Sequence, residues 1–158
     1  MRRVPLRYLV PLLVFLHFLL HLGFGLGVEA PDLLTVALLV AARELGMGLG
    51  GGLGLVLGLL EDASSVLAFG ANAVAMTVVG ALGARTRDFF VGDSRWFVFA
   101  YVALGKWLKD LVHWIAVGEQ LREPFLNALF LVGFFSAVYA GLIAVGVMMP
   151  AGDREAQR

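Results

Sequence analysis

The residues whose types and spacing could support chemistry are concentrated between positions 106 and 113. Lys106, Asp110 and His113 follow one another at intervals of four and three residues, and Lys109 lies beside them. In a helix this spacing places an acid, two bases and an imidazole along one stripe. The segment is therefore the first candidate for a functional site.

Three interpretations of this stripe stay open. Lys106 and Asp110 could neutralise each other in the interior of a helical bundle or in a water-filled outer cavity. They could instead provide an anchoring charge for a partner subunit, or belong to a proton or ion relay. A relay would need further acids in the middle of neighbouring helices, and we expect the other helices to provide none.

His17 and His21 have the spacing that can hold a metal ion on a helix. A metal site needs at least three protein ligands, and no Asp, Glu or Cys lies in the same apolar run. The chain contains 0 Cys, so thiolate sites and disulfides are excluded. We expect two interior histidines and neither a metal nor a cofactor.

Glu61 and Asp62 form an adjacent carboxylate pair. Adjacent residues point about 100° apart on a helix, which does not suit paired acid–base catalysis. Asp62 is instead expected to order the following loop by accepting backbone N–H bonds from residues 63–66. The chain also has no phosphate-binding glycine motif and no hydrolase triad, so we expect no enzyme.

The composition sets the environment in which these residues must be positioned. Of 158 residues, 60% are hydrophobic and 15% are charged, and the mean hydropathy is +0.88. Soluble domains contain about 45–50% apolar residues, so this composition excludes the soluble globular class. The 12 basic and 12 acidic residues balance, which argues against nucleic acid as a partner.

The apolar runs predict an all-α bundle of six transmembrane helices forming a single membrane domain over 1–158. The second and third helices are short for full spans, so a re-entrant hairpin is the alternative. The predicted helices cover residues 8–28, 33–45, 47–60, 66–84, 96–117 and 125–149, followed by a tail over 150–158.

The basic residues predict the orientation of these helices. One side of the membrane collects Arg2, Arg3, Arg7, Arg43, Arg85, Arg87, Arg95, Arg154 and Arg158. The other side holds only Arg122 and the acidic residues Glu29, Asp32, Glu61, Asp62, Glu119 and Glu123. By the positive-inside rule both termini are cytoplasmic and the acidic residues lie in outer loops.

Glycines recur every four residues in the third predicted helix, at Gly46, Gly50, Gly54 and Gly58. This spacing places four positions without side chains on one face, where a neighbouring backbone can approach closely. The face could pack within the molecule or receive a partner's transmembrane helix. Both interpretations stay open.

Three segments carry a resemblance to a known family. They are Pro31–Leu34, the run from Gly54 to Asp62, and the run from Phe69 to Gly80, which includes Gly70 and Asn72. With Asp110 as a further correspondence, the chain resembles the MreD family of rod shape-determining membrane proteins.

The resemblance implies a non-enzymatic scaffold in the bacterial inner membrane. Such a protein binds MreC and helps couple MreB filaments to RodA and its penicillin-binding transpeptidase, and thereby contributes to cell shape. We expect the single helix of MreC to dock on the membrane face of the bundle, and its periplasmic part to meet the acidic outer loops.

Two other function classes remain as alternatives. A substrate-binding S component of an energy-coupling factor vitamin transporter has a similar size and six helices, and should have an aromatic outer pocket studded with polar groups. Its first helix should also carry an Ala-xxx-Ala face, whereas residues 8–28 are rich in Leu and Phe. The third class is an ion or proton carrier, and the only residues that support this assignment are Lys106, Asp110 and His113.

Overall fold

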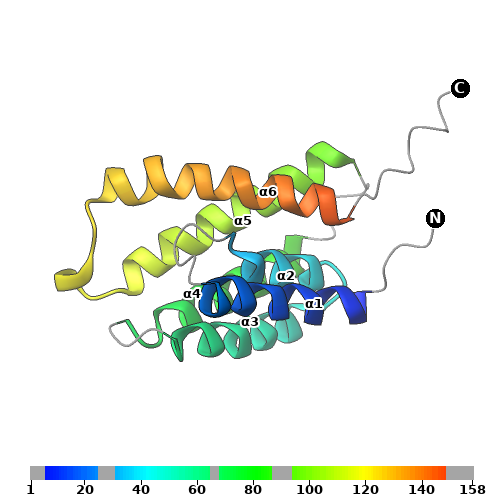
Figure 1. Cartoon of the computed structure of the whole chain (residues 1–158), viewed down its shortest axis with the longest axis horizontal. Helices are drawn as coiled ribbons and strands as arrows, with labels where there is room; N and C mark the ends of the chain where they lie inside the picture. The colour runs from blue at the N-terminus through cyan, green and yellow to red at the C-terminus, as the bar shows by residue number, and fades with distance from the viewer. Residues whose placement is uncertain (1–5, 25–30, 65–67, 87–93, 149–158) are drawn as a thin grey trace, which may run out of the picture.

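The computed structural model describes residues 6–24, 31–64, 68–86 and 94–148, and this part of the chain forms six α-helices without a strand (Figure 1). The first three helices are α1 (Leu6–Phe18), which continues as a π-helical turn (Leu19–Gly23), α2 (Leu33–Ala42) and α3 (Met47–Asp62). The others are α4 (Ala71–Thr86), α5 (Arg95–Ala116) and α6 (Gly133–Met148). A 3-10 turn (Glu119–Leu121) and a π-helical segment (Asn127–Val132) connect α5 to α6.

The predicted all-α class and the order of the helices are confirmed, but several bounds differ. The second helix ends at Ala42 rather than at residue 45, and the described part of the first ends at Gly23. The fourth begins at Ala71, because residues 68–70 form a turn in which Gly70 has a φ of +95°. This backbone conformation favours glycine. Positions 66 and 67 lie outside the described residues.

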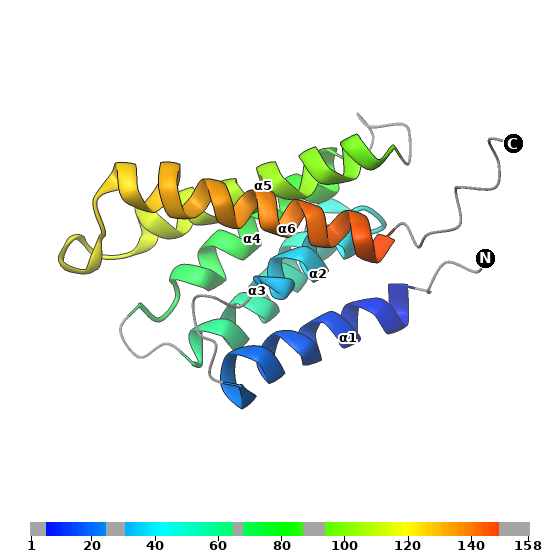
Figure 2. The ribbon, with the colours of Figure 1, turned by 45° about the horizontal axis from the view of Figure 1, so that its top comes forward.

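Helix α2 is the centre of the bundle. All ten of its residues are buried, and it contacts each of the other five helices. Figure 2 shows α2 enclosed between α1 on one side and the α5–α6 pair on the other. A continuously apolar helix such as Leu33–Ala42 suits this place because every face meets another helix.

Helices α3 and α4 pack at very short range through the predicted glycine face. A Cβ at Gly50 would lie 2.5 Å from the carbonyl oxygen of Gly80, and one at Gly58 would lie 2.5 Å from the Cα of Ala73. A Cβ at Gly54 would overlap the carbonyl group of Met76. The close approach predicted from the glycine spacing is therefore confirmed, and α4 of the same chain occupies the face.

Gly46 does not belong to this contact. It is the N-cap of α3, and in the described part of the chain no atom lies within 4 Å of a Cβ built there. The prediction of four equivalent glycines was wrong at this position, because Gly46 precedes the helix in an extended conformation and the contact with α4 begins at Gly50.

Large apolar side chains are exposed on every helix except α2. Phe15 is 62% exposed on α1, Leu49 is 68% exposed on α3, and Phe135 is 68% exposed on α6. Two helical segments, Leu6–Gly23 and Asn127–Met148, are long and apolar enough to cross a membrane by length and composition. The molecule thus combines many exposed apolar side chains with buried polar groups such as Lys106, Lys109 and Asp62.

The first turn of α1 and the last turn of α6 lie at the same end of the bundle (Figures 1 and 2). The loop between α5 and α6 and the C-terminal end of α3 lie at the opposite end. This second end carries the polar site.

Candidate functional site: a buried charge cluster and its cavity

Two buried lysines on α5 are the centre of the site. Lys106 and Lys109 are only 5% and 6% exposed. Lys106 forms an ion pair with Asp110 one turn further along the helix. The Nζ atom of Lys106 also lies 3.6 Å from Oδ2 of Asp32. The predicted neutralisation of Lys106 by Asp110 is therefore confirmed.

Lys109 joins α5 to two other helices. Its Nζ atom lies 3.4 Å from Oδ2 of Asp32, at the start of α2, and 3.2 Å from Oε1 of Glu61, at the end of α3. A buried ammonium group without partners would cost several kcal/mol. These two carboxylates provide the compensation and thereby connect α2, α3 and α5.

This arrangement corrects one expectation, the placement of Asp32 and Glu61 in outer loops. The expectation that the middle of the neighbouring helices provides no further acids is not contradicted, since Asp32 is the N-cap of α2 and Glu61 lies in the last turn of α3. Both carboxylates in fact belong to the buried cluster, because the first turn of α2 and the last turn of α3 meet α5 at the same level. One signal was available in the sequence: two lysines on a stripe with one aspartate leave an excess cation, which requires an acid from elsewhere.

Asp32 has a structural role besides its ion pairs. It is the N-cap of α2, where Oδ1 accepts the backbone N–H of Thr35 at 2.9 Å and Oδ2 accepts the Thr35 hydroxyl at 2.8 Å. Burial acts to raise the pKa of Asp32, but Lys109, Lys106 and the Thr35 hydrogen bonds outweigh it and hold the pKa below its ordinary value. Asp32 is thus an anionic cap that also holds the two lysines.

Asp62 is fully buried and orders the start of α4. Its Oδ2 atom accepts the backbone N–H groups of Gly70 and Ala73, both at 2.9 Å, and its Oδ1 atom accepts that of Asn72 at 3.1 Å. The predicted role in ordering a loop is confirmed, but two of the predicted donors were wrong: the N–H groups of Ala63 and Ser64 bind the carbonyls of Leu59 and Glu61. The other two predicted donors, at positions 65 and 66, lie outside the described residues. The free N–H groups of α4 begin at the Gly70 turn, and a carboxylate is favourable at this positive end of the helix.

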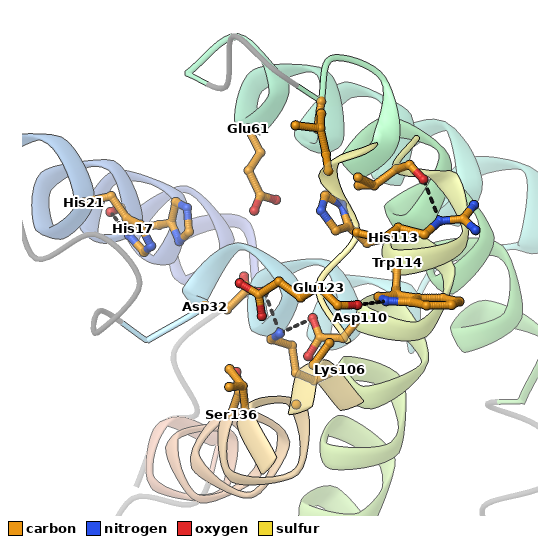
Figure 3. Close-up of a pocket in the computed structure, with 17 residues that line it drawn as sticks. His17, His21, Asp32, Glu61, Lys106, Asp110, His113, Trp114, Glu123 and Ser136 are labelled. Carbon is orange, nitrogen blue, oxygen red and sulfur yellow. Dashed lines mark hydrogen bonds and ion pairs between the residues drawn. The ribbon is translucent and has the colours of Figure 1, made fainter. Parts of the chain in front are cut away.

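A cavity of about 520 Å³ lies beside the charge cluster (Figure 3). Its polar wall includes Asp32, Glu61, Lys106, Asp110 and His113, and its size falls in the range of small-molecule sites. The predicted group Lys106, Asp110 and His113 therefore faces one cavity. Lys109 is not among the residues that line the cavity, but it forms ion pairs with Asp32 and Glu61, which do.

The segment that follows α5 forms one edge of the cavity. Trp114 donates its indole N–H to the carbonyl of Glu123 at 2.9 Å, and the guanidinium carbon of Arg122 lies 5.0 Å from the centroid of the Trp114 ring. Arg122 Nε also donates to the carbonyl of Val117 at 2.8 Å. Trp114 was not among the predicted site residues, although an aromatic residue one position after His113 was a signal for it.

His17 of α1 and His21 of the π-helical turn that follows it also reach the cavity. The rings of His17 and His21 stack at 4.0 Å, and both residues line the cavity. Within the residues that the structure describes, no group of three or more His, Cys, Asp or Glu side chains is arranged to hold a metal ion. The pair thus contributes its imidazole rings to the wall of the cavity.

The remaining predicted residues lie away from the cavity. Gly50, Gly54, Gly58 and Gly80 belong to the α3–α4 contact, and Gly70 belongs to the turn before α4. Asn72 is 7% exposed in the first turn of α4. Searches with this chain found no matching protein-family model, no matching curated protein and no matching solved structure.

Proposed function

We propose that this chain is a non-enzymatic scaffold in the bacterial inner membrane, acting in the cell-elongation complex as members of the MreD family do. One observation carries the proposal: the segments on which the resemblance rests contact one another. Gly54 and Gly58 pack against residues 72–77, and Asp62 binds the amides of Gly70, Asn72 and Ala73. The resemblance therefore involves one packed unit and not scattered residues.

We infer a multi-pass arrangement with six transmembrane helices and both termini in the cytoplasm. The exposed apolar side chains on five helices and the two membrane-length helices support a lipid environment. The positions of the start of α1 and the end of α6, at one end of the bundle, support an even number of crossings. Two arginines lie at that end, Arg7 in the first turn of α1 and Arg43 beside Met148 at the end of α6, and they support the cytoplasmic assignment.

The proposed partner is MreC, and its single helix needs a free face. Because α4 covers Gly54 and Gly58, we assign the opposite face of α3, which carries Gly48, Gly52 and the exposed Leu55. In the described part of the chain, a Cβ at Gly48 or Gly52 would meet no atom within 4 Å. Two glycines at this spacing allow close approach of another helix, which is what drives association in lipid.

Co-purification of tagged chain with MreC tests this proposal. We expect the double variant Gly48→Leu/Gly52→Leu to recover several-fold less MreC than the parent chain. Gly146→Leu on α6 is the matched control, since Gly146 also faces open space among the described residues. Full recovery by a correctly inserted double variant would exclude this face, and failure of the parent chain to bind MreC would exclude the scaffold. We propose that the chain reaches MreB, RodA and the transpeptidase through its complex with MreC.

A second candidate is the S component of a vitamin transporter, and the cavity is the observation that favours it. The wall combines Trp114 with several polar groups, as that class requires. The absence of an Ala-xxx-Ala face in residues 8–28 argues against it. A rise in unfolding temperature with one vitamin from a panel would favour this candidate, and no rise with any of them would leave the scaffold as the better proposal.

A further inference from the structure

Three polar atoms in the wall of the cavity have no partner among the described residues. They are Nδ1 of His17, Oε2 of Glu61 and Nδ1 of His113, from α1, α3 and α5. His17 is only 3% exposed. Figure 3 shows the carboxylate of Glu61 pointing into the space between the two imidazole rings. Three helices therefore direct unsatisfied groups into one cavity.

All three atoms can accept hydrogen bonds. A carboxylate oxygen only accepts, and the Nδ1 atom of a neutral imidazole accepts when the proton is on Nε2. Leaving such a group buried and unsatisfied costs about 1–3 kcal/mol. A molecule that brings hydrogen-bond donors would remove this cost.

The charges around the cavity favour a cation. The cluster contains the carboxylates of Asp32, Glu61 and Asp110 but only two ammonium groups, those of Lys106 and Lys109. Arg122 and Glu123 also line the cavity and add one charge of each sign. One negative charge remains without a counterpart in this set, and Glu61 carries the unpaired oxygen.

The cavity is too large for a single ion or water molecule. At about 520 Å³ it exceeds many times the roughly 30 Å³ that one water occupies in the liquid. The described residues offer no cluster for direct metal coordination. Other parts of the wall are apolar and include Val117, Leu121 and Val132, which suits a ligand with a hydrocarbon part.

We propose that this cavity binds a primary ammonium group attached to an apolar body. An ammonium group has three donors and no acceptor, which matches the three orphaned acceptors and the excess negative charge. Two sources carry this chemistry, the headgroup of phosphatidylethanolamine and a free alkylamine. The inference is independent of the scaffold proposal, which concerns the outer face of α3.

The first arm of the test uses soluble probes with the full chain in detergent. Hexylamine is compared with hexyltrimethylammonium, which carries the same charge but no N–H donor. We expect hexylamine to raise the unfolding temperature in a saturable manner and the trimethyl form to have no comparable effect. This result would identify a free amine as a sufficient ligand.

The second arm uses lipid. The chain is placed in nanodiscs of equal amounts of phosphatidylethanolamine and phosphatidylcholine, and retained lipid is measured by native mass spectrometry after release. Selective retention of phosphatidylethanolamine would identify the headgroup as the source. Equal responses to the ammonium and trimethylammonium forms in both arms would overturn the proposal.

Two variants connect the response to the orphaned atoms. Glu61→Gln removes the negative charge and His113→Phe removes one acceptor without affecting an ion pair, and each is expected to weaken the preferred response at least tenfold. Glu44→Gln, an exposed acid outside the cavity, is the control and should bind as the parent chain does. If Glu61→Gln does not fold, the test depends on His113→Phe alone. A folded His113→Phe variant that binds the preferred ligand as tightly as the parent chain would overturn the proposal.

Discussion

The Nζ atom of Lys109 lies 3.2 Å from Oε1 of Glu61, although the two residues are 48 positions apart in the chain. Both side chains lie at the end of the bundle that carries the charge cluster. The pair shows that α3 and α5 are held together by charge as well as by packing. The most direct test of the cluster is therefore to remove one partner and measure the loss in stability of the folded state.

Lys109→Met is expected to destabilise the protein strongly. The substitution keeps most of the side-chain volume but leaves Asp32 and Glu61 without their shared cation, and breaking a buried ion pair in this way costs about 3–5 kcal/mol. Thermal unfolding in detergent measures the loss. The double variant Lys109→Met/Glu61→Gln should recover part of the lost stability, and additive losses would show that the two residues are not coupled.

Gly54→Ala and Gly52→Ala form a matched pair on α3. A Cβ at Gly54 overlaps the carbonyl group of Met76, so we expect a loss of about 1–3 kcal/mol or more. A Cβ at Gly52 meets open space among the described residues, so we expect a gain of about 0.5–1 kcal/mol from the lower entropy of the unfolded chain. Equal unfolding temperatures for the two variants would contradict the α3–α4 contact.

Asp62→Ala is expected to loosen the first turn of α4. The amides of Gly70, Asn72 and Ala73 lose their acceptor, and hydrogen bonds to a charged group contribute about 1.5–3 kcal/mol. Hydrogen exchange should accelerate in residues 70–73 before it changes in α2. Glu44→Gln provides a control, and unchanged exchange at α4 in Asp62→Ala would show that the carboxylate does not hold this turn.

The contribution of Asp32 should depend on pH in a defined direction. Because the folded state lowers its pKa from the ordinary value of 3.8, the stabilisation is fully present above about pH 4 and is lost as the pH falls further. Unfolding temperatures of the parent chain and Asp32→Asn should therefore differ most at pH 7, and the difference should narrow steadily as the pH falls below about 4. A difference that stays constant over this range would contradict the ionised cap.

Reconstituted liposomes distinguish a scaffold from a carrier. We expect liposomes containing the chain to conduct protons no faster than empty liposomes under an imposed gradient, as a pH-sensitive dye would report. The measurement is informative because the structure adds Asp32 and Glu61 to the acids available for a relay. A flux that disappears in Asp110→Asn would favour the carrier and argue against the scaffold.

Several features of this protein can be predicted from the order of its amino acids because they depend on the period of a helix. The ion pair between Lys106 and Asp110 follows from their separation by one turn. The close contact of α3 follows from glycines at intervals of four residues. The helical class follows from the length of the apolar runs.

Other features depend on how the helices are arranged around α2. The partner of Lys109 at the start of α2, Asp32, is 77 positions away, and helical periodicity carries no information about such a pair. The same limit applies to the neighbour of the glycine face, which is α4, and to the shared cavity of His17, Glu61 and His113. Local spacing determines which side chains lie on one face of a helix, whereas only the packing of helices determines what that face meets.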